Sequence, residues 1–366
     1  MSLRKTSATA PHLAVGIDTK KYILAMASIE EVIEHFRIVE TFDDKYQQQN
    51  AFAHIVESCW NEFGPSQRYL KRLVLQYVNQ LEREGEAAES DALSELVLHV
   101  SLRKDNVPES NESCYLSFQI PEKEGMDDSI DGWLRIRVFP YHNDVALRLW
   151  EAGAALAEYF LDHPFLLKNM HVIELGAGVG LTGLVIAACC NPSSVYLTDY
   201  TDVCRNNLRH NLEINRKWLA RHGVSSDQIA EGYLEWESFA HPTGLTVNEM
   251  NDDPAMVSFQ RAQVLIAADV LYDVSVIDSL VLVVKRFLTQ QSNRQRKEVI
   301  FAITRRNMNT FNLFLDHLRG HGIHCTYLAK SCENLIKMFP CNFFQGREDV
   351  QVAQLRLTAF HDDDVR

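Results

Sequence analysis

The stretch that decides the fold is Val172-Ile-Glu-Leu-Gly-Ala-Gly-Val-Gly-Leu-Thr-Gly183. A short apolar run leads into a glycine turn, and the apolar residues that follow predict a helix over Leu181–Cys189. Such a strand, turn and helix form the nucleotide-binding opening of a doubly wound α/β sheet. Gly176, Gly178 and Gly180 carry no Cβ, so the backbone can turn tightly and approach a ligand closely.

Two departures from the dinucleotide pattern indicate which ligand binds. A dinucleotide fingerprint requires its third glycine at position 181, where this chain has Leu181. Glu174 lies two residues before the first glycine, where a carboxylate would repel a pyrophosphate but suits the positively charged methionyl end of S-adenosylmethionine. These residues predict a methyltransferase rather than a dehydrogenase. The alternative is a glycine turn that binds nothing.

Asp199 follows 23 residues after Gly176, at the end of the next predicted strand. A carboxylate at that point can accept hydrogen bonds from both hydroxyls of a ribose. The alternative role for Asp199 is that of an N-cap for the helix beginning near Asp202.

Composition excludes several classes of protein. The chain has 366 residues, of which 46% are hydrophobic and 23% charged, as in an ordinary globular protein. That length predicts one large domain with an appendage. No apolar run approaches the roughly 20 residues that span a bilayer, so we expect no membrane partner. The net charge of −13 disfavours a nucleic-acid partner and suits a basic protein surface.

The eight cysteines contain no C-x-x-C pair, which argues against a disulfide framework and for a reducing compartment, the cytoplasm. His321, His324 and Cys325 lack a second closely spaced pair of ligands. We therefore interpret these three residues as structural and expect no metal.

The domain organisation follows from changes in pattern along the chain. Residues 1–20 are expected to form a disordered tail, residues 21–103 a helical N-terminal domain, and residues 104–113 a linker. The helical stretch contains one proline, Pro65, and apolar residues recur in it at helical spacing. Its helices carry no chemical motif, so they are either packing faces or a docking surface for a protein partner.

Residues 114–366 alternate between strand and helix patterns, which predicts a mostly parallel sheet covered on both faces. A hairpin over Cys114–Pro121 and Trp133–Pro140 and a helix over Leu147–Phe160 come first. Further helices are expected over Asp202–Arg216, Ser275–Leu288 and Asn307–Gly320. The seven expected strands are His171–Leu175, Ser194–Thr198, Glu231–Trp236, Val264–Ala268, Glu298–Ile303, Ile323–Leu328 and Val350–Leu357.

Ligands of such sheets bind at the carboxyl ends of the strands. Trp236 is expected at the end of the third strand, where its indole either lies against adenine or packs in the core. Asp269 and Tyr272 follow the fourth strand and would face the sulfonium and the incoming nucleophile, unless they are a capping acid and a buried ring. Trp150 either closes over the cofactor or packs in the core.

These motifs together resemble the seven-β-strand protein-lysine methyltransferases. The resemblance covers roughly Cys114 to Leu357. The helical N-terminus looks like that of the elongation factor 2 lysine methyltransferase group, and so do the segments Phe301-Ala-Ile-Thr-Arg-Arg-Asn307 and Lys337-Met-Phe-Pro340. The residues that carry the family resemblance are Trp150, Glu174–Gly183, Thr198-Asp199, Leu234-Glu-Trp236 and Asp269-Val-Leu-Tyr272.

The resemblance implies a seven-stranded, Rossmann-like class I methyltransferase sheet, with an N-terminal hairpin and a separate helical N-terminal domain. It implies S-adenosylmethionine as cofactor, S-adenosylhomocysteine as product, and a protein-lysine substrate, elongation factor 2. The helical domain would recognise that partner, and we expect a monomer. The alternatives are another protein lysine, a small molecule, or a non-catalytic interaction protein.

The resemblance also assigns roles to residues. Asp269 and Tyr272 would border the lysine channel, and Asp269 would act either as a base or as an orienting group. The residues that would contact the cofactor are Trp150, Glu174, Gly176, Asp199, Trp236 and Ala268, and the glycine pattern adds Gly178.

Overall fold

The computed structural model divides into two units, which are described separately. The first comprises Met1–Pro121, Trp133–His142 and Phe339–Asn342, and the second the remainder. The expected tail 1–20 and linker 104–113 lie mostly outside the described residues. The structure describes residues 19–39, 42, 44–102, 108, 111–120, 132–240, 253–290, 297–329, 338–340, 344 and 347–358.

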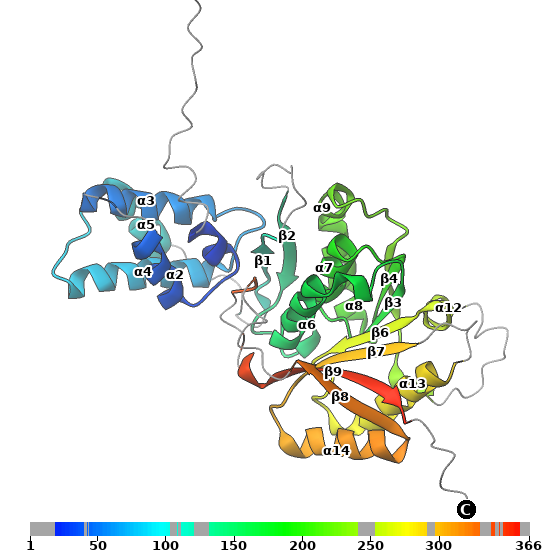
Figure 1. Cartoon of the computed structure of the whole chain (residues 1–366). Helices are drawn as coiled ribbons and strands as arrows, with labels where there is room; N and C mark the ends of the chain where they lie inside the picture. Colours follow the sequence, from blue (N-terminus) through cyan, green and yellow to red (C-terminus); the bar gives the residue numbers. More distant parts are fainter. Residues whose placement is uncertain are drawn as a thin grey trace, which may run out of the picture. The chain divides into compact units, whose positions relative to one another are not determined.

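The described part of the first unit is largely helical, as the apolar spacing predicted (Figure 1). Phe36, Phe52 and Tyr77 meet at its centre, and the rings of Phe52 and Tyr77 stack at 3.8 Å between centroids. The buried Gln49 side chain accepts hydrogen bonds from the backbone N–H groups of Glu89 and Ser90 and so fixes the turn before the last helix. The helices are α2 (Ile29–Val39), α3 (Lys45–Ser58), α4 (Gln67–Arg83) and α5 (Asp91–Leu102).

The predicted hairpin consists of β1 (Cys114–Phe118) and β2 (Leu134–Val138), paired antiparallel with Cys114 opposite Val138. It belongs to the helical unit, because the backbone N–H of Tyr115 donates to the carbonyl of Gly64 at 3.1 Å and buried side chains continue the helical core. This grouping differs from our placement of the hairpin in a domain over residues 114–366.

The second unit contains the predicted seven-stranded sheet, in the order β5-β4-β3-β6-β7-β9-β8. The first five strands in this order are parallel, and β9 runs antiparallel to both of its neighbours. This arrangement confirms the Rossmann-like fold expected from the sequence. The strands are β3 (His171–Leu175), β4 (Ser194–Asp199), β5 (Ile229–Tyr233), β6 (Val264–Ala268), β7 (Glu298–Thr304), β8 (Ile323–Ala329) and β9 (Val350–Leu357).

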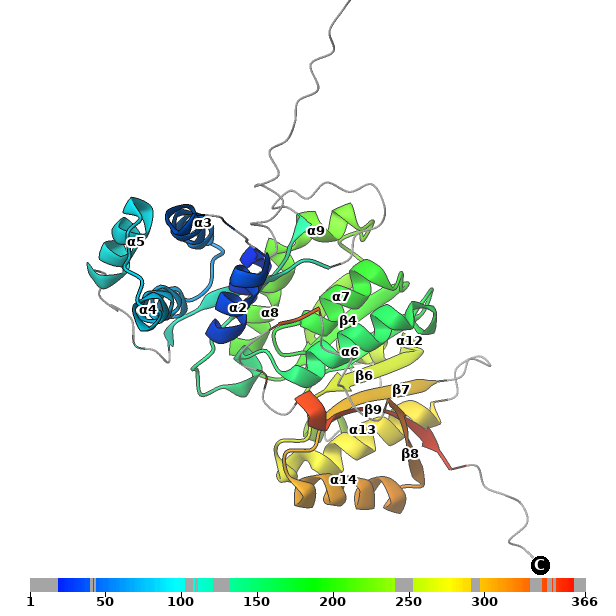
Figure 2. The same cartoon turned by 60° about the vertical axis from the view of Figure 1, so that its left-hand side comes forward.

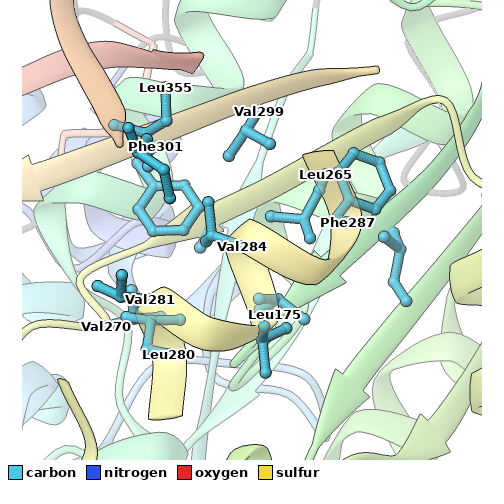
Figure 3. Close-up of a cluster of buried hydrophobic side chains, with 14 of the residues drawn as sticks. Leu175, Leu265, Val270, Leu280, Val281, Val284, Phe287, Val299, Phe301 and Leu355 are labelled. Atoms are coloured by element: carbon cyan, nitrogen blue, oxygen red, sulfur yellow. The ribbon is translucent and has the colours of Figure 1, made fainter. Parts of the chain in front are cut away.

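Helices cover both faces of this sheet, with α6 and α7 on one side and α13 and α14 on the other (Figure 2). An apolar layer between the strands and α13 holds the sheet together, and Leu175, Leu265, Phe287 and Phe301 are fully buried in it (Figure 3). The helices of this unit are α6 (Glu151–Asp162), α7 (Leu181–Cys189), α8 (Asp202–Ile214), α9 (Arg216–Arg221), α10 (Trp236–Ala240), α12 (Pro254–Arg261), α13 (Ile277–Thr289) and α14 (Met308–Gly320).

Element boundaries differ from the sequence expectations at two places that concern the site. The third strand of the unit ends at Tyr233 rather than Trp236, and Trp236 instead begins α10. Helix α6 begins at Glu151 rather than Leu147, because Trp150 is extended at the N-cap. Both tryptophans therefore lie at the N-terminal end of a helix, Trp150 as the N-cap of α6 and Trp236 as the first residue of α10.

Candidate active site

The candidate site lies where the carboxyl ends of β3, β4 and β6 meet. Strand β3 pairs with β4 on one side and with β6 on the other, so the chain reverses its winding direction at β3. Connections leave such a point in opposite directions and open a crevice above the strand ends. Glu174, Asp199 and Asp269 come to this edge from the three strands.

The glycine turn after β3 adopts the left-handed conformation that its sequence predicted. Gly176, Gly178 and Gly180 have φ angles of 61°, 55° and 86°. A Cβ at Gly180 would lie 2.5 Å from Cδ1 of Leu208, so a larger residue would have to move that side chain and would also be strained by the positive φ. The turn thus presents bare backbone toward the strand ends.

Glu174 is a buried carboxylic acid, with 2% of its surface exposed. Among the residues that the structure describes, none is hydrogen-bonded to its Oε2 atom, and the nearby hydroxyl of Thr182 donates instead to the carbonyl of Gly153 at 3.1 Å. Burial raises the pKa of Glu174 to about 8, against the smaller opposing effects of Thr182 and the Gly183 backbone. A buried acceptor without a donor is costly, so this oxygen is suited to a ligand that supplies a positive group.

Asp199 is held by the glycine turn at the end of β4. Its Oδ2 accepts the backbone N–H of Gly178 at 3.1 Å, and its Oδ1 accepts that of Tyr200 at 2.8 Å. Burial raises the pKa of the Asp199 carboxyl, and these backbone donors act in the opposite direction. Thr201, not Asp199, is the N-cap of α8, with its hydroxyl accepting the N–H of Cys204. Asp199 is therefore not a helix cap.

Trp236 lies beside the glycine turn. A Cβ at Gly176 would fall 3.5 Å from a ring atom of Trp236 and 3.0 Å from a methyl of Val270. The half-buried indole also packs against the apolar layer of the sheet. Its position is compatible with both roles that the sequence left open, a wall of the site and a part of the core.

Asp269 follows Ala268, the last residue of β6, with a φ of 54°. A left-handed non-glycine residue is uncommon, and such backbone is often found at functional sites. The Asp269 N–H donates to the carbonyl of Ala302 at 3.0 Å, and its Oδ1 accepts the N–H of Thr304 at 3.3 Å. These bonds to β7 hold the residue in its strained conformation.

Tyr272 is exposed to solvent, with 55% of its surface accessible, so the alternative of a buried core ring does not apply. Loss of solvent around its hydroxyl, followed by the charges of Tyr200 and Asp199, raises the pKa of Tyr272 to about 12. The phenol therefore stays neutral at physiological pH and can donate or accept a hydrogen bond.

Two residues that sequence reasoning did not single out complete the site. Arg306 bonds to the carboxylates of Glu151 and Asp269, and its guanidinium lies 4.8 Å from the ring centre of Trp150. Glu151 is fully buried in α6. The sequence signals were an acid inside an apolar helical pattern and, for Arg306, its place in the segment Phe301–Asn307 that carries the subgroup resemblance, where no role was assigned to it.

The described residues contain no cluster of three or more His, Cys, Asp or Glu side chains that could hold a metal ion. His317 and His321 instead lie 3.0 and 3.8 Å from a carboxylate oxygen of Asp278. Among the residues that the structure describes, no helix is both long and apolar enough to cross a bilayer.

Comparison with known proteins shows several relatives. The human proteins FAM86B2 and FAM86B1 are 33% identical over 220 residues, which are 59% of this chain and 60% of theirs. The chain therefore spans about three-fifths of these relatives. The protein-lysine N-methyltransferase EEF2KMT of mouse is 26% identical over 82% of this chain and 81% of its own length. The human EEF2KMT is 27% identical over 77% and 78%.

Among solved structures, the methyltransferase domain of bacterial CtHen1 aligns with 57% of this chain and 100% of its own, with a TM-score of 0.37 and 12% identity. A likeness at that level carries no argument about activity. The family model described as lysine methyltransferase matches residues 134–320, just over half of the sequence. These residues include every strand end that forms the site. The chain belongs to the lysine methyltransferase family.

Proposed function

We propose that this protein transfers a methyl group from S-adenosylmethionine to a lysine of elongation factor 2. The observation that carries the proposal is the pair of buried carboxylic acids, Glu174 and Asp199, at adjacent strand ends. Among the described residues, neither acid forms an ion pair with a lysine or an arginine. Membership of the lysine methyltransferase family supports a lysine as the acceptor.

The residues at β3 and β4 fit S-adenosylmethionine. The unpartnered Oε2 of Glu174 can accept the cofactor's α-ammonium group, and that bond would satisfy a buried polar atom. Asp199 retains acceptor capacity on both oxygens for the ribose hydroxyls. Gly176 and Gly178 leave space for the methionine moiety, and Trp150, Trp236 and Ala268 would border the rest. When bound, the cofactor supplies an electrophilic methyl group on a sulfonium.

The residues at β6 and β7 would receive the lysine. A free lysine has a pKa of about 10.4, so few molecules are neutral at physiological pH. Desolvation next to a sulfonium lowers that pKa and frees the lone pair on Nζ. Both carboxylate oxygens of Asp269 already accept hydrogen bonds from the protein, from Thr304 and Arg306. This favours an orienting role for Asp269 over that of a general base, with Tyr272 as a second polar contact.

Transfer then requires alignment and electrostatics, with no covalent intermediate on the protein. The lysine Nζ forms a bond to the methyl carbon as the carbon–sulfur bond breaks, and the bonding electrons stay on sulfur. The proton lost by the lysine passes to solvent. Holding nucleophile and methyl group in line is the main contribution of such a site.

Elongation factor 2 is proposed as substrate from two kinds of support. The relatives named EEF2KMT align over about four-fifths of this chain. The net charge of −13 suits a basic partner surface. The helical unit would contribute recognition, because the sheet unit has no evident feature for selecting one large protein. We propose that the protein acts as a cytoplasmic monomer.

The test is methylation of an extract from cells that lack this protein. Purified full-length protein and labelled S-adenosylmethionine should label one band, which mass spectrometry should identify as elongation factor 2 with a modified lysine. The variant Glu174→Gln serves as a control for cofactor dependence. Identical lysine methylation of elongation factor 2 in the mutant and parental cells would refute the proposed substrate, and a different labelled protein would name another.

A further inference from the structure

Arg306 joins three elements of the site through one side chain. It follows the end of β7 and forms an ion pair with Asp269, after β6, at 3.1 Å. It forms a second ion pair with Glu151, in the first turn of α6. Its guanidinium also lies over the indole of Trp150, the residue that caps the same helix. Nη2 of Arg306 bonds to both carboxylates while the guanidinium plane covers the indole, an arrangement that suits a planar cation with several donors better than a compact ammonium.

The surroundings make these contacts strong. Glu151 has no exposed surface, and its Oε2 has no hydrogen-bond partner, so Arg306 provides its compensating charge. Burial, followed by the neighbouring Asp269, raises the pKa of Glu151. For Arg306, burial alone would lower the pKa, but the two carboxylates outweigh it and the net direction is upward. The arginine therefore stays charged between two acids.

Each contact restricts a residue assigned to the reaction. One oxygen of the Asp269 carboxylate accepts a hydrogen bond from the Thr304 N–H, and the other accepts one from Arg306. The Trp150 indole is fixed at its edge, where Nε1 donates to the carbonyl of Val145 at 2.8 Å, and on a face by Arg306. Without Arg306, both groups would gain rotational freedom.

We propose that Arg306 is a positioning residue, which aligns Asp269 for methyl transfer and holds Trp150 for cofactor binding. This inference rests on the proposed function, since it takes the roles of Asp269 and Trp150 from it. Glu151 holds the Arg306 guanidinium in place through their ion pair. Arg306 itself needs no contact with substrate or cofactor.

The chain offers a matched control in the adjacent residue. Arg305 has a similar exposure, 35% of its side chain against 41% for Arg306. It pairs with Asp349, in the 3-10 turn just before β9, at 3.8 Å, and within the described residues it shares none of the contacts that Arg306 makes with Trp150, Glu151 and Asp269. Substituting each arginine by glutamine removes the same charge from the same turn, so the difference between the two variants isolates the three contacts of Arg306.

The first experiment measures binding of S-adenosylhomocysteine by calorimetry, without any transfer. Arg306→Gln should weaken binding about fivefold, the size of one lost cation–π contact, and Arg305→Gln should leave it unchanged. In the Trp150→Ala background, adding Arg306→Gln should produce no further loss. Equal losses in both backgrounds, or no loss at all, would contradict the proposal.

The second experiment measures transfer to elongation factor 2 at saturating cofactor. Arg306→Gln should lower kcat about 30-fold in the wild-type chain but less than threefold in an Asp269→Asn background, because a residue acting through Asp269 has nothing left to position. Additive losses would mean an independent role and overturn the assignment. Arg306→Lys, which retains the charge, should recover part of kcat but not the binding affinity. If Arg306→Gln folds poorly, the comparison is made in a Glu151→Gln background instead. There, Glu151→Gln/Arg306→Gln should again have lower kcat and weaker binding than Glu151→Gln alone.

The two proposals fail in different ways. If the wild-type chain binds S-adenosylhomocysteine but does not methylate elongation factor 2, the proposed substrate is wrong and the binding cycle alone decides the role of Arg306. If transfer occurs and Arg306→Gln behaves like Arg305→Gln in both assays, the substrate stands and Arg306 is only a surface arginine.

Discussion

The two halves of the site treat their acidic residues in opposite ways. At the ends of β3 and β4, Glu174 and Asp199 are buried, and within the described residues no arginine or lysine is paired with either. At the ends of β6 and β7, Asp269 and Glu151 share Arg306. The first half leaves its buried acids without a cationic partner among the described residues, while the second half pairs its acids with an arginine.

This difference separates a half built to bind from a half built to align. Uncompensated buried acceptors lower the stability of the free protein and recover that free energy when a ligand with matching donors enters. A carboxylate already held by an arginine and a backbone N–H gains less from a new cation but keeps a fixed orientation. We therefore expect substitution of the acids in the first half to affect cofactor affinity and substitution of Asp269 in the second to affect transfer.

The largest effect is expected from the glycine turn of the binding half. Gly178 has a φ of 55°, and a Cβ there would meet the carbonyl oxygen of Ala146 at 3.3 Å. Gly178→Val should reduce S-adenosylhomocysteine binding below detection in calorimetry, because the branched side chain is strained and occupies the ligand's space. Gly223→Val is the matched control, since Gly223 has a φ of 80° and no atom within 4 Å of its Cβ position. Equal binding by the two variants would show that the turn does not contact the cofactor.

Asp199→Ala should have the next largest effect. Two charge-assisted bonds to the ribose hydroxyls are worth about 1.5–3 kcal/mol each, so we expect the free energy of cofactor binding to weaken by about 2–4 kcal/mol. Thr201→Ala, which removes the cap of α8, should lower the melting temperature and leave affinity unchanged. An Asp199→Ala protein with unchanged affinity and a lower melting temperature would reduce Asp199 to a structural role.

In the aligning half, Asp269→Ala should reduce methyl transfer and leave cofactor affinity nearly unchanged. We expect kcat for lysine methylation to fall about 100-fold, equivalent to about 2.7 kcal/mol of transition-state stabilisation, while the affinity for S-adenosylhomocysteine changes less than threefold. Single-turnover kinetics and calorimetry on the same preparation measure the two quantities. Parallel losses in both would erase the distinction between the halves.

The smallest effect is a pH dependence confined to Glu174. Its pKa of about 8 in the free protein lies above the ordinary value of 4.5, so the acid is protonated at neutral pH. A cationic ligand requires the carboxylate, so affinity should rise by at most about tenfold per pH unit from pH 6 and level off above pH 8. Glu174→Gln should bind weakly with no such slope, and a slope retained in that variant would assign the titration elsewhere.

The raised pKa of Glu174 also determines whether the free energy of unfolding rises or falls with pH. Because the folded state holds a proton that the unfolded state has already released, Glu174 favours folding at low pH, and that contribution is lost as pH rises from about 4.5 to 8. Urea unfolding of the free protein at pH 6 and pH 8 measures it, with Glu174→Gln as reference. The free energy of unfolding should fall more between pH 6 and pH 8 in the wild-type protein than in the variant. A smaller fall in the wild-type protein would contradict the predicted direction.

The sequence alone determined the sheet and the binding half of the site. The bounds of α7, β3, β6 and β9 agree with the structure to the residue, since apolar runs and glycines are local signals. Glu174 and Asp199 come together because carboxyl ends of neighbouring parallel strands share an edge, which topology guarantees.

Only the tertiary structure decided the aligning half. Arg306 and Glu151 are separated by 155 residues, and they meet because α6 packs against β7. The N-terminal hairpin, likewise, joins the helical unit through contacts that its alternating pattern does not reveal. A residue's periodicity reports which face of its own element it occupies. The partner that it meets depends on how distant elements pack, and that information is not carried by any single segment.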